Sequence, residues 1–181
     1  MSAVSAAFEK LAEYYGRCRH QARDLPSQQD LVRYWSGIGF VLDEVRYVAP
    51  LEEVSEILSV PSYTRVPGVL NWMKGVANVR GRLMTVMDLT GFLEKTTSLN
   101  ESRRRVLVMD QGELYTGLVV DEVLGMQHFP EENYVDEPPE LDPVVRPYTR
   151  GAYKRAEGYW PVFSLFQLAE DPRFLQVART G

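Results

Sequence analysis

The pattern of hydrophobic and polar positions along the chain changes near Trp35. From there onward, short apolar runs rich in Val, Ile, Phe and Tyr are interrupted every several residues by Gly, Asp or Pro. Runs of this kind, bounded by turn residues, are typical of β-strands, and a series of them is typical of an all-β barrel or sandwich. The sequence therefore predicts a mainly β domain over residues 31–181.

The first 30 residues follow a different period. Apolar side chains recur at alternating spacings of four and three, which places them on one face of a helix: Val4, Phe8, Leu11, Tyr15, Cys18 and Ala22. Pro26 and the polar residues 27–30 interrupt this period, so residues 1–30 are predicted to form an amphipathic helix and a linker. Amphipathic helices usually cover their own core, and we expect this one to pack on the β domain; docking on a partner is the alternative.

The predicted strands occur in a repeated order. Residues 40–47 and 107–115 each read as a strand, an acidic turn and a strand that ends in an aromatic residue. An acidic pair and a valine follow in both halves, and a glycine and a closing strand come later: Glu52, Glu53, Val54 and Gly81 in the first half, Asp121, Glu122, Val123 and Gly158 in the second. Two similar small barrels, each closed so that few strand edges stay exposed, would explain this repeat.

The segment from Val66 to Leu93 contains the clearest turn signals. A turn at Pro67-Gly68 precedes a strand that we expect to begin at Gly75 and to carry Arg80. Gly81 then predicts a tight hairpin into the next apolar strand. Because glycine allows the backbone conformation that such a turn requires, Arg80 should lie on the hairpin with its guanidinium in solvent.

Composition restricts the class of protein. A chain of 181 residues with 45% hydrophobic content can bury a sizeable core. Its 20 basic and 25 acidic side chains give a formal charge of -5, which argues against nucleic-acid binding because that function needs a basic face. The basic cluster Arg103–Arg105 is expected to be a solvated strand entry, and the Pro-rich acidic segment Glu131–Asp142 an exposed loop.

Candidate chemistry is sparse. Cys18 is the single cysteine, so no intramolecular disulfide can form, and neither an export signal nor an apolar run of about 18 residues is present; we expect a cytoplasmic protein. His20 lies on a different helical face from Cys18, and His128 is expected to be a structural or edge residue. Asp88 and Asp121 end apolar strands, where Asp commonly satisfies turn amides. We therefore expect no enzymatic activity, no cofactor and no metal site.

An ordered motif carries the functional signal. Over roughly 25 residues the chain combines Pro-Gly, Trp, Gly-Val, Asn-x-Arg-Gly and Asp-Leu: Pro67, Gly68, Trp72, Gly75, Val76, Asn78, Val79, Arg80, Gly81, Asp88 and Leu89. This motif resembles the CheW family of adaptors, which couple chemoreceptors to a CheA-type histidine kinase, and the resemblance extends from about Trp35 to Leu168. Many members carry Pro where this chain has Thr85. The phrases at 35–40 and 120–130 are most similar to PilI-type adaptors of the type IV pilus twitching pathway.

The resemblance implies a fold and partners. The fold would be two SH3-like five-stranded β-barrels side by side, preceded by the N-terminal amphipathic helix. The crevice between the barrels would take the helical cytoplasmic tip of a methyl-accepting chemoreceptor, and the hydrophobic edge of the first barrel would meet the regulatory domain of a CheA-type kinase. Such an adaptor would be cytoplasmic and recruited to the inner face of the membrane through receptor arrays.

The resemblance also implies a partner-binding role for six residues: Val54, Glu56, Ile57, Asn78, Arg80 and Gly81. Arg80 would communicate with Glu56, while Val54 and Ile57 would supply apolar area beside them. The residues alone favour an ordinary exposed hairpin arginine at Arg80 and a core position for Ile57, and they leave Val54 undecided between core and surface. The alternative function is a small β-barrel nucleic-acid-binding protein, which would need aromatic residues interleaved with a basic groove.

Overall fold

The structure is a computed structural model, and it describes residues 10, 14, 32–96, 101–139 and 141–178. The chain divides into two compact units, Met1–Val32 and Arg33–Gly181. The apolar helix face predicted between Val4 and Ala22 lies outside the described residues. Among the described helices, none combines the length and the apolar character needed to span a bilayer.

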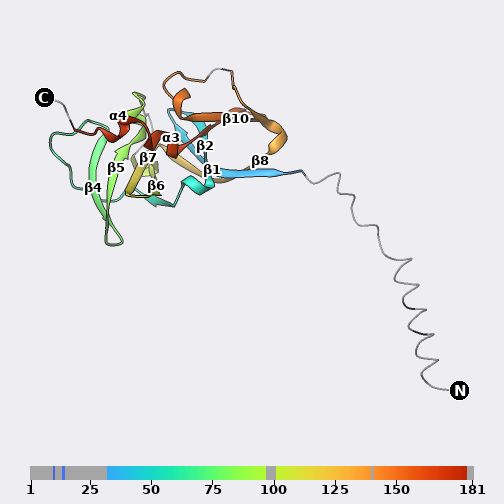
Figure 1. Cartoon of the computed structure of the whole chain (residues 1–181), viewed down its shortest axis with the longest axis horizontal. Helices are drawn as coiled ribbons and strands as arrows, with labels where there is room; N and C mark the ends of the chain where they lie inside the picture. The colour runs from blue at the N-terminus through green and yellow to red at the C-terminus, as the bar shows by residue number, and fades with distance from the viewer. Residues whose placement is uncertain (1–9, 11–13, 15–31, 97–100, 140, 179–181) are drawn as a thin grey trace. The chain divides into compact units, whose positions relative to one another are not determined.

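Two β-sheets make up the second unit (Figure 1), which confirms the predicted mainly β fold. The six-stranded sheet has the order β8 (Glu122–Pro130), β1 (Tyr34–Leu42), β2 (Val45–Pro50), β11 (Gly158–Phe163), β10 (Thr149–Arg155) and β9 (Tyr134–Val135). The five-stranded sheet has the order β3 (Glu56–Ser59), β6 (Arg105–Gln111), β7 (Leu114–Val120), β5 (Arg82–Asp88) and β4 (Met73–Val79). Short helices lie between the strands: η2 (Leu51–Glu53), α2 (Leu89–Phe92), η3 (Glu101–Arg103), η4 (Glu131–Asn133) and η5 (Arg146–Tyr148). Two more follow the last strand, α3 (Leu165–Ala169) and α4 (Pro172–Leu175).

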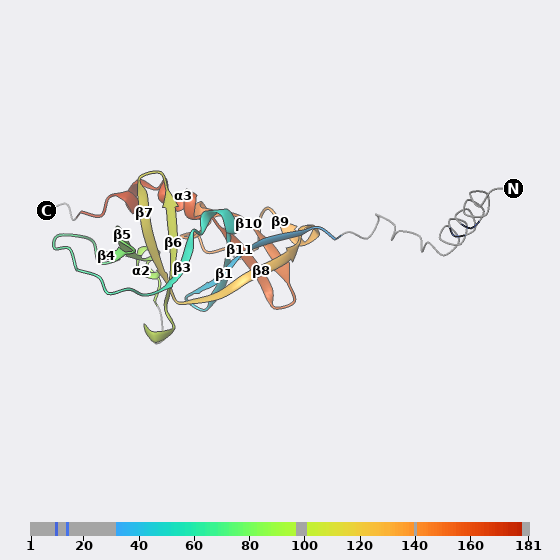
Figure 2. The same cartoon turned by 90° about the horizontal axis from the view of Figure 1, so that it is seen from below.

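The two halves of the sequence repeat exchange their first hairpins. The first half supplies β1–β5 and the second supplies β6–β11, yet β1 and β2 belong to the six-stranded sheet with β8, β11 and β10. In the same way β6 and β7 lie between β3 and β5 of the first half. The strand orders correspond position by position, and each contains one parallel pair between halves, β2 with β11 and β7 with β5. The repeat is therefore present, but each sheet contains strands from both halves (Figure 2).

Each sheet is closed by contacts between strands that lie far apart in its strand order. In the six-stranded sheet, Arg155 of β10 donates hydrogen bonds to the Gln127 side chain (3.0 Å) and to the His128 carbonyl (2.9 Å) of β8. In the five-stranded sheet, the segment after β3 pairs with β4 through two backbone hydrogen bonds between Thr64 and Val76 (2.8 and 2.9 Å). These contacts cover strand edges that would otherwise be open to pairing.

Three apolar clusters stabilise this arrangement. One lies within the six-stranded sheet: Val48, Phe129, Tyr153, Trp160 and Val162. Another lies within the five-stranded sheet: Ala77, Met84, Val86, Val106, Val108 and Val119. The largest lies between the two sheets, and its strand residues include Phe40, Tyr47 and Phe163 on one side and Met87, Leu107 and Leu118 on the other. Because buried apolar area is the main favourable term in folding, this central cluster fixes the two sheets against each other.

The acidic segment Glu131–Asp142 contains only short elements, η4 and the two-residue strand β9. Its prolines are consistent with this, since β9 is the outermost strand of its sheet. Most of its described side chains are exposed, as predicted. One end is attached to the domain, because the Lys95 ammonium contacts the Asp142 carboxylate at 2.7 Å.

Candidate partner-binding site

The predicted hairpin is formed by β4 and β5, whose tip extends away from the rest of the sheet in Figure 1. Val79 pairs with Arg82, so Arg80 and Gly81 are the two turn residues, and both have positive φ (52° and 84°). Two successive positive φ values define a type I′ turn, the type that matches the twist of a hairpin. The Asn78 side chain accepts a hydrogen bond from the Gly81 amide at 2.9 Å, so Asn78 and Gly81 shape the turn that displays Arg80.

Arg80 and Glu56 form the contact that the family resemblance implies. The Arg80 guanidinium lies 2.5 Å from the Glu56 carboxylate, and the two side chains are 76% and 25% exposed. Glu56 belongs to β3 and Arg80 follows β4, so the pair connects the two edge strands of the five-stranded sheet. An exposed pair of this kind contributes less than about 1 kcal/mol to stability. Its geometry is present, and its role in partner binding stays a prediction.

The apolar residues beside this pair differ in exposure. Ile57 is 39% exposed, so its expected place in a barrel core is wrong. The reason is the alternation of side chains along β3: Leu58 packs against the core of the five-stranded sheet, which turns Ile57 to the outside. Val54 is partly buried against the central cluster. Ile57 therefore offers apolar area on the outer face of β3, opposite to the face of its neighbours Glu56 and Leu58, while Val54 packs toward the interior.

The structure adds three residues to this region that sequence reasoning missed. Arg82 forms a two-pronged contact with Asp110 (2.5 and 3.1 Å), and its guanidinium lies 4.0 Å from the centre of the Tyr115 ring. The hydrogen bonds from Arg82 lower the pKa of Asp110. Leu83 is 73% exposed, the highest value among the large hydrophobic residues described. We call the surface formed by Glu56, Ile57, Arg80, Arg82, Leu83 and Asp110 the hairpin-tip surface.

A buried carboxylate lies where the chain passes from one sheet to the other. Glu53 is 2% exposed and ends η2, which connects β2 to the segment leading into β3. Its carboxylate accepts hydrogen bonds from the Ser164 hydroxyl (3.0 Å) and the Phe166 amide (3.2 Å), and Arg150 lies 3.2 Å away. The acidic pair of the sequence repeat was the available signal for this residue. In the acidic pair of the second half, Asp121 is the buried member: it is 1% exposed and accepts from the Asp43 amide (2.8 Å) and the Thr90 hydroxyl (3.3 Å).

Arg104 is not solvated, which corrects the interpretation of the basic cluster Arg103–Arg105. It is 9% exposed, and its guanidinium contacts Asp88 at 2.5 and 3.2 Å, while the Lys74 ammonium lies 2.9 Å from the same carboxylate. Burial would raise the pKa of Asp88, but the hydrogen bonds from Arg104 and Lys74 outweigh it and lower the pKa. Asp88 also caps α2, in agreement with the structural role expected for it.

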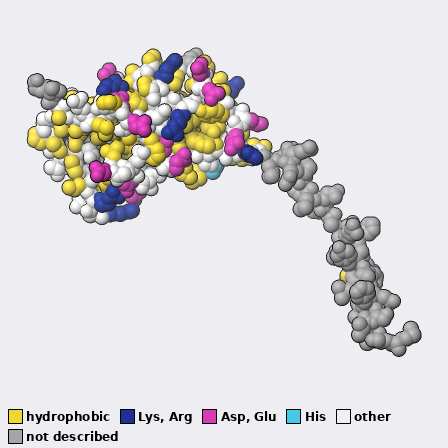
Figure 3. All heavy atoms as spheres, in the orientation of Figure 1, with side chains coloured by type: hydrophobic (Ala, Val, Ile, Leu, Met, Phe, Trp, Pro, Cys, Tyr) yellow, Lys and Arg dark blue, Asp and Glu magenta, His cyan; other side chains and the backbone are white. Residues whose placement is uncertain are grey.

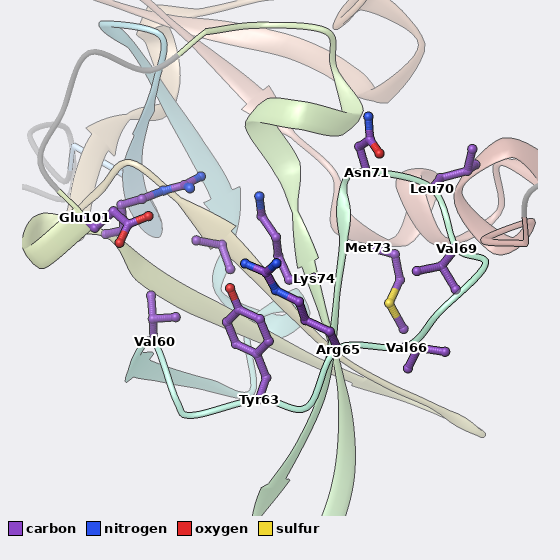
Figure 4. A pocket seen from close by; sticks show the side chains of 12 residues that line it. Val60, Tyr63, Arg65, Val66, Val69, Leu70, Asn71, Met73, Lys74 and Glu101 are labelled. Carbon is purple, nitrogen blue, oxygen red and sulfur yellow. The ribbon is translucent and has the colours of Figure 1, made fainter.

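A cavity of about 670 Å³ lies beside this ion cluster, between the segment Val60–Asn71 and the ends of β4 and β7. Tyr63, Arg65 and Lys74 contribute polar side chains to its lining (Figure 4). The remaining expectations of sequence concern single residues. His128 is exposed on the edge strand β8 and contacts the Ser36 hydroxyl at 2.7 Å, as expected for an edge residue. In the described part of the chain, no group of three or more His, Cys, Asp or Glu side chains is placed to hold a metal ion.

The fold and the hairpin motif define a class of protein that comparison with known families identifies. The model of the CheW-like domain matches residues 36–173, and the chain belongs to this family. A solved structure of the scaffolding protein TtCheW from Thermoanaerobacter tengcongensis has the same fold, with a TM-score of 0.67 and 21% identity; the match covers 78% of this chain and 96% of that one.

Two relatives with assigned names are similar in sequence. Protein PilI from Pseudomonas aeruginosa is 47% identical over 178 residues, which are 98% of this chain and 99% of PilI. Protein FrzA from Myxococcus xanthus is 31% identical over 99 residues, 55% of this chain and 62% of FrzA. The similarity to PilI therefore includes residues before the CheW-like domain, and the similarity to FrzA covers about half of this chain.

Proposed function

We propose that this chain is a non-enzymatic adaptor that binds a CheA-type histidine kinase and a methyl-accepting chemoreceptor at the same time, in a chemosensory pathway that controls type IV pili. Membership of the CheW-like family supports the adaptor role. Identity of 47% with PilI over 98% of the chain supports the assignment to the pilus branch. In this role the chain acts in the cytoplasm and reaches the membrane through its receptor partner.

The kinase regulatory domain binds at the hairpin-tip surface. The observation that carries this proposal is the Arg80 and Glu56 pair at the exposed hairpin tip. Exposed apolar side chains lie on the strand that carries Glu56 and on the strand that follows Arg80, Ile57 on β3 and Leu83 on β5. Small protein interfaces combine an apolar centre with charged groups at the margin. Because the Arg80 side chain is 76% exposed while one of its nitrogens contacts Glu56, the guanidinium keeps donors free for a carboxylate of the partner. The pair therefore orients the partner and contributes little to the stability of the fold.

The receptor tip binds where the margin of the central cluster reaches the surface. Partly buried apolar side chains surround that cluster, among them Val54, Trp72, Phe92, Leu114 and Phe166. A helix of the receptor presents its apolar face as a stripe at spacings of three and four, which suits a surface of this kind. Val54 borders both surfaces, since it contacts the central cluster and lies two residues before Glu56.

Simultaneous binding gives the adaptor its effect. Holding receptor and kinase on one rigid domain raises the effective concentration of each at the other. A change in receptor packing then shifts the population of kinase states only if the adaptor binds those states with different affinity. The two closed sheets and the central cluster provide the rigidity that this requires.

The alternative of a nucleic-acid-binding barrel has less support. The stacked aromatic rings Trp35, Tyr153 and Phe129 belong to the cluster within the six-stranded sheet, where bases cannot stack on them. On the face in Figure 3, acidic and basic side chains are mixed. Retention of the protein on a heparin column above about 0.3 M salt would favour the alternative; elution with the void volume at low salt is the expected result.

Calorimetric titration of the kinase regulatory domain tests the proposed surface. Arg80→Glu should lower the affinity at least tenfold, the effect expected when a charge at an interface is reversed against its partner. Arg65→Glu makes the same change at an exposed arginine in the loop before β4 and should leave the affinity unchanged. Equal affinities for the wild type and both variants would remove Arg80 from the interface.

A further inference from the structure

Glu53 connects the two sheets at the point where the chain crosses between them. It ends η2, so β2 of the six-stranded sheet precedes it and β3 of the five-stranded sheet follows it. Its side chain is 1% exposed, and such a carboxylate is costly to bury unless every oxygen finds a donor. The hydrogen-bond donors to Glu53 belong to elements far away in the sequence. Glu53 therefore holds distant elements together and does not only stabilise its own turn.

Those donors belong to β10 and to the first turn of α3. The Oε1 atom accepts from the Ser164 hydroxyl at 3.0 Å and lies 3.2 Å from the Arg150 guanidinium, and the Oε2 atom accepts from the Phe166 amide at 3.2 Å. Ser164 is itself the N-cap of α3 and accepts from the Gln167 amide. Displacement of β10 or α3 must therefore move Glu53 or break its contacts.

The chain that follows Glu53 leads directly to the hairpin-tip surface. The Ser55 amide donates to the Val108 carbonyl at 2.8 Å, which begins the pairing of β3 with β6. The next residue is Glu56, the partner of Arg80. Only Val54 and Ser55 thus separate the buried carboxylate of Glu53 from the partly exposed carboxylate of Glu56, about 10 Å of extended chain. Because no flexible linker lies between Glu53 and Glu56, a displacement of Glu53 also displaces Glu56.

We infer that Glu53 is a positioning residue that couples β10 and α3 to the hairpin-tip surface: its contacts with Arg150, Ser164 and Phe166 set the place of β3, and hence of Glu56, for partner binding. This inference rests on the proposed function and extends it with a route by which one sheet influences the other. A ligand or partner that displaces β10 or α3 changes the affinity at Glu56 and Arg80. Coupling between sites in proteins commonly amounts to about 5- to 150-fold in affinity.

The first test needs no partner. Arg150→Met removes the cation that contacts Glu53. Because the Arg150 side chain is 44% exposed, the fold should persist. Hydrogen exchange of the Ser55 amide, measured by NMR, should become at least fivefold faster relative to the amides of β7. Arg146→Met is the matched control, since this exposed arginine of η5 lies near the same sheet and has no contact with Glu53 among the described residues. Unchanged exchange at Ser55 in Arg150→Met would overturn the inference.

The second test measures affinity for the kinase regulatory domain. Arg150→Met should weaken binding about fivefold although Arg150 lies in the other sheet, and Glu53→Gln should weaken it at least as much. Asp121→Asn removes the buried carboxylate from the acidic pair of the second half, which precedes β8 instead of β3, and it should leave this affinity unchanged. An equal loss of affinity in Asp121→Asn would show a general effect of stability and would overturn the inference.

The two proposals fail in different ways. If Arg80→Glu weakens kinase binding while Arg150→Met and Glu53→Gln do not, the inference is wrong and the proposed function stands. If none of these three variants changes the affinity, the hairpin-tip surface is not the kinase site, and the exchange of the Ser55 amide alone decides whether Glu53 positions β3. A double variant Arg150→Met/Glu56→Gln should lose less affinity than the sum of the single losses, because both changes act through β3.

Discussion

The ion cluster of Arg104, Asp88 and Lys74 offers the sharpest test of the packing. The sequence predicted a solvated Arg104, whereas the structure has Arg104 in a buried ion pair with Asp88. Arg104→Met replaces the guanidinium-bearing side chain with a shorter, unbranched apolar one. The variant leaves Asp88, whose side chain is 9% exposed, without its contacts of 2.5 and 3.2 Å to Arg104. Lys74 stays at 2.9 Å, with 34% of its side chain exposed.

The expected loss follows from this geometry. Removing one partner of a buried ion pair costs about 3–5 kcal/mol when the other charge is left alone. Because Lys74 remains beside Asp88, we expect the lower end, about 3 kcal/mol. In a domain of this size about 1 kcal/mol lowers the thermal midpoint by about 2–4 °C, so the midpoint of Arg104→Met should fall by about 6–12 °C.

Urea unfolding followed by tryptophan fluorescence gives the free energy directly. Arg103→Met is the matched control: it is the neighbouring arginine, it is exposed, and it should change stability by less than about 0.5 kcal/mol. Replacing Asp88 with Asn in the Arg104→Met background should recover part of the loss, since it removes a buried charge that only the partly exposed Lys74 still contacts. If Arg104→Met unfolds within about 0.5 kcal/mol of the wild type, Arg104 is solvated and the buried pair is not formed.

Three further predictions concern pH and the N-terminal segment. Burial raises the pKa of Tyr47 to about 12, so the folded form keeps this phenol protonated above its ordinary pKa. The contribution of Tyr47 to stability should be complete below about pH 10 and should decrease as the pH rises toward 12. Urea midpoints at several pH values would measure this decrease. The pKa of Asp171, which burial alone would raise, is lowered because hydrogen bonds from Arg173 and Tyr148 prevail, so its contribution is present above about pH 4 and is lost on acidification; Asp171→Asn should flatten the acid limb of the same titration. Deleting residues 1–30 should lower the thermal midpoint by many degrees if the predicted apolar helix face packs on the β domain, because several large side chains would be lost from the interface at about 1.5–3 kcal/mol each. An unchanged midpoint with weaker partner binding would instead support docking on a partner.

Local signals in the sequence predicted the parts of the fold that local chemistry decides. The glycine after Arg80 and the apolar strands around it predicted the β4–β5 hairpin, because a type I′ turn depends on a few adjacent residues. The repeat predicted two similar sheets. The contact of Arg80 with Glu56 came only from the family resemblance, since 24 residues separate the two in the chain.

The remaining features depend on contacts that sequence order does not reveal. The repeat in the sequence is the same whether each half forms its own sheet or the two halves exchange their first hairpins. The sequence therefore could not show that the exchange occurs. Ile57 and Leu58 are both apolar, and only the register of β3 decides which one faces solvent. In the sequence Arg104 is one charge in a basic run, and only the fold shows that Asp88 and Lys74 lie beside it. Glu53 was visible as half of an acidic pair, but its burial depends on α3 and β10, about a hundred residues later.

Reconstitution of the ternary complex tests the central claim most directly. The kinase regulatory domain and a helical receptor-tip fragment would be mixed with and without this protein and analysed by size-exclusion chromatography with light scattering. We predict a peak with the mass of all three components when the wild-type protein is present, its absence when the protein is omitted, and a marked reduction with Arg80→Glu but not with Arg65→Glu. If receptor fragment and kinase domain compete for the protein and only binary complexes form, the protein is not an adaptor that binds both partners at once.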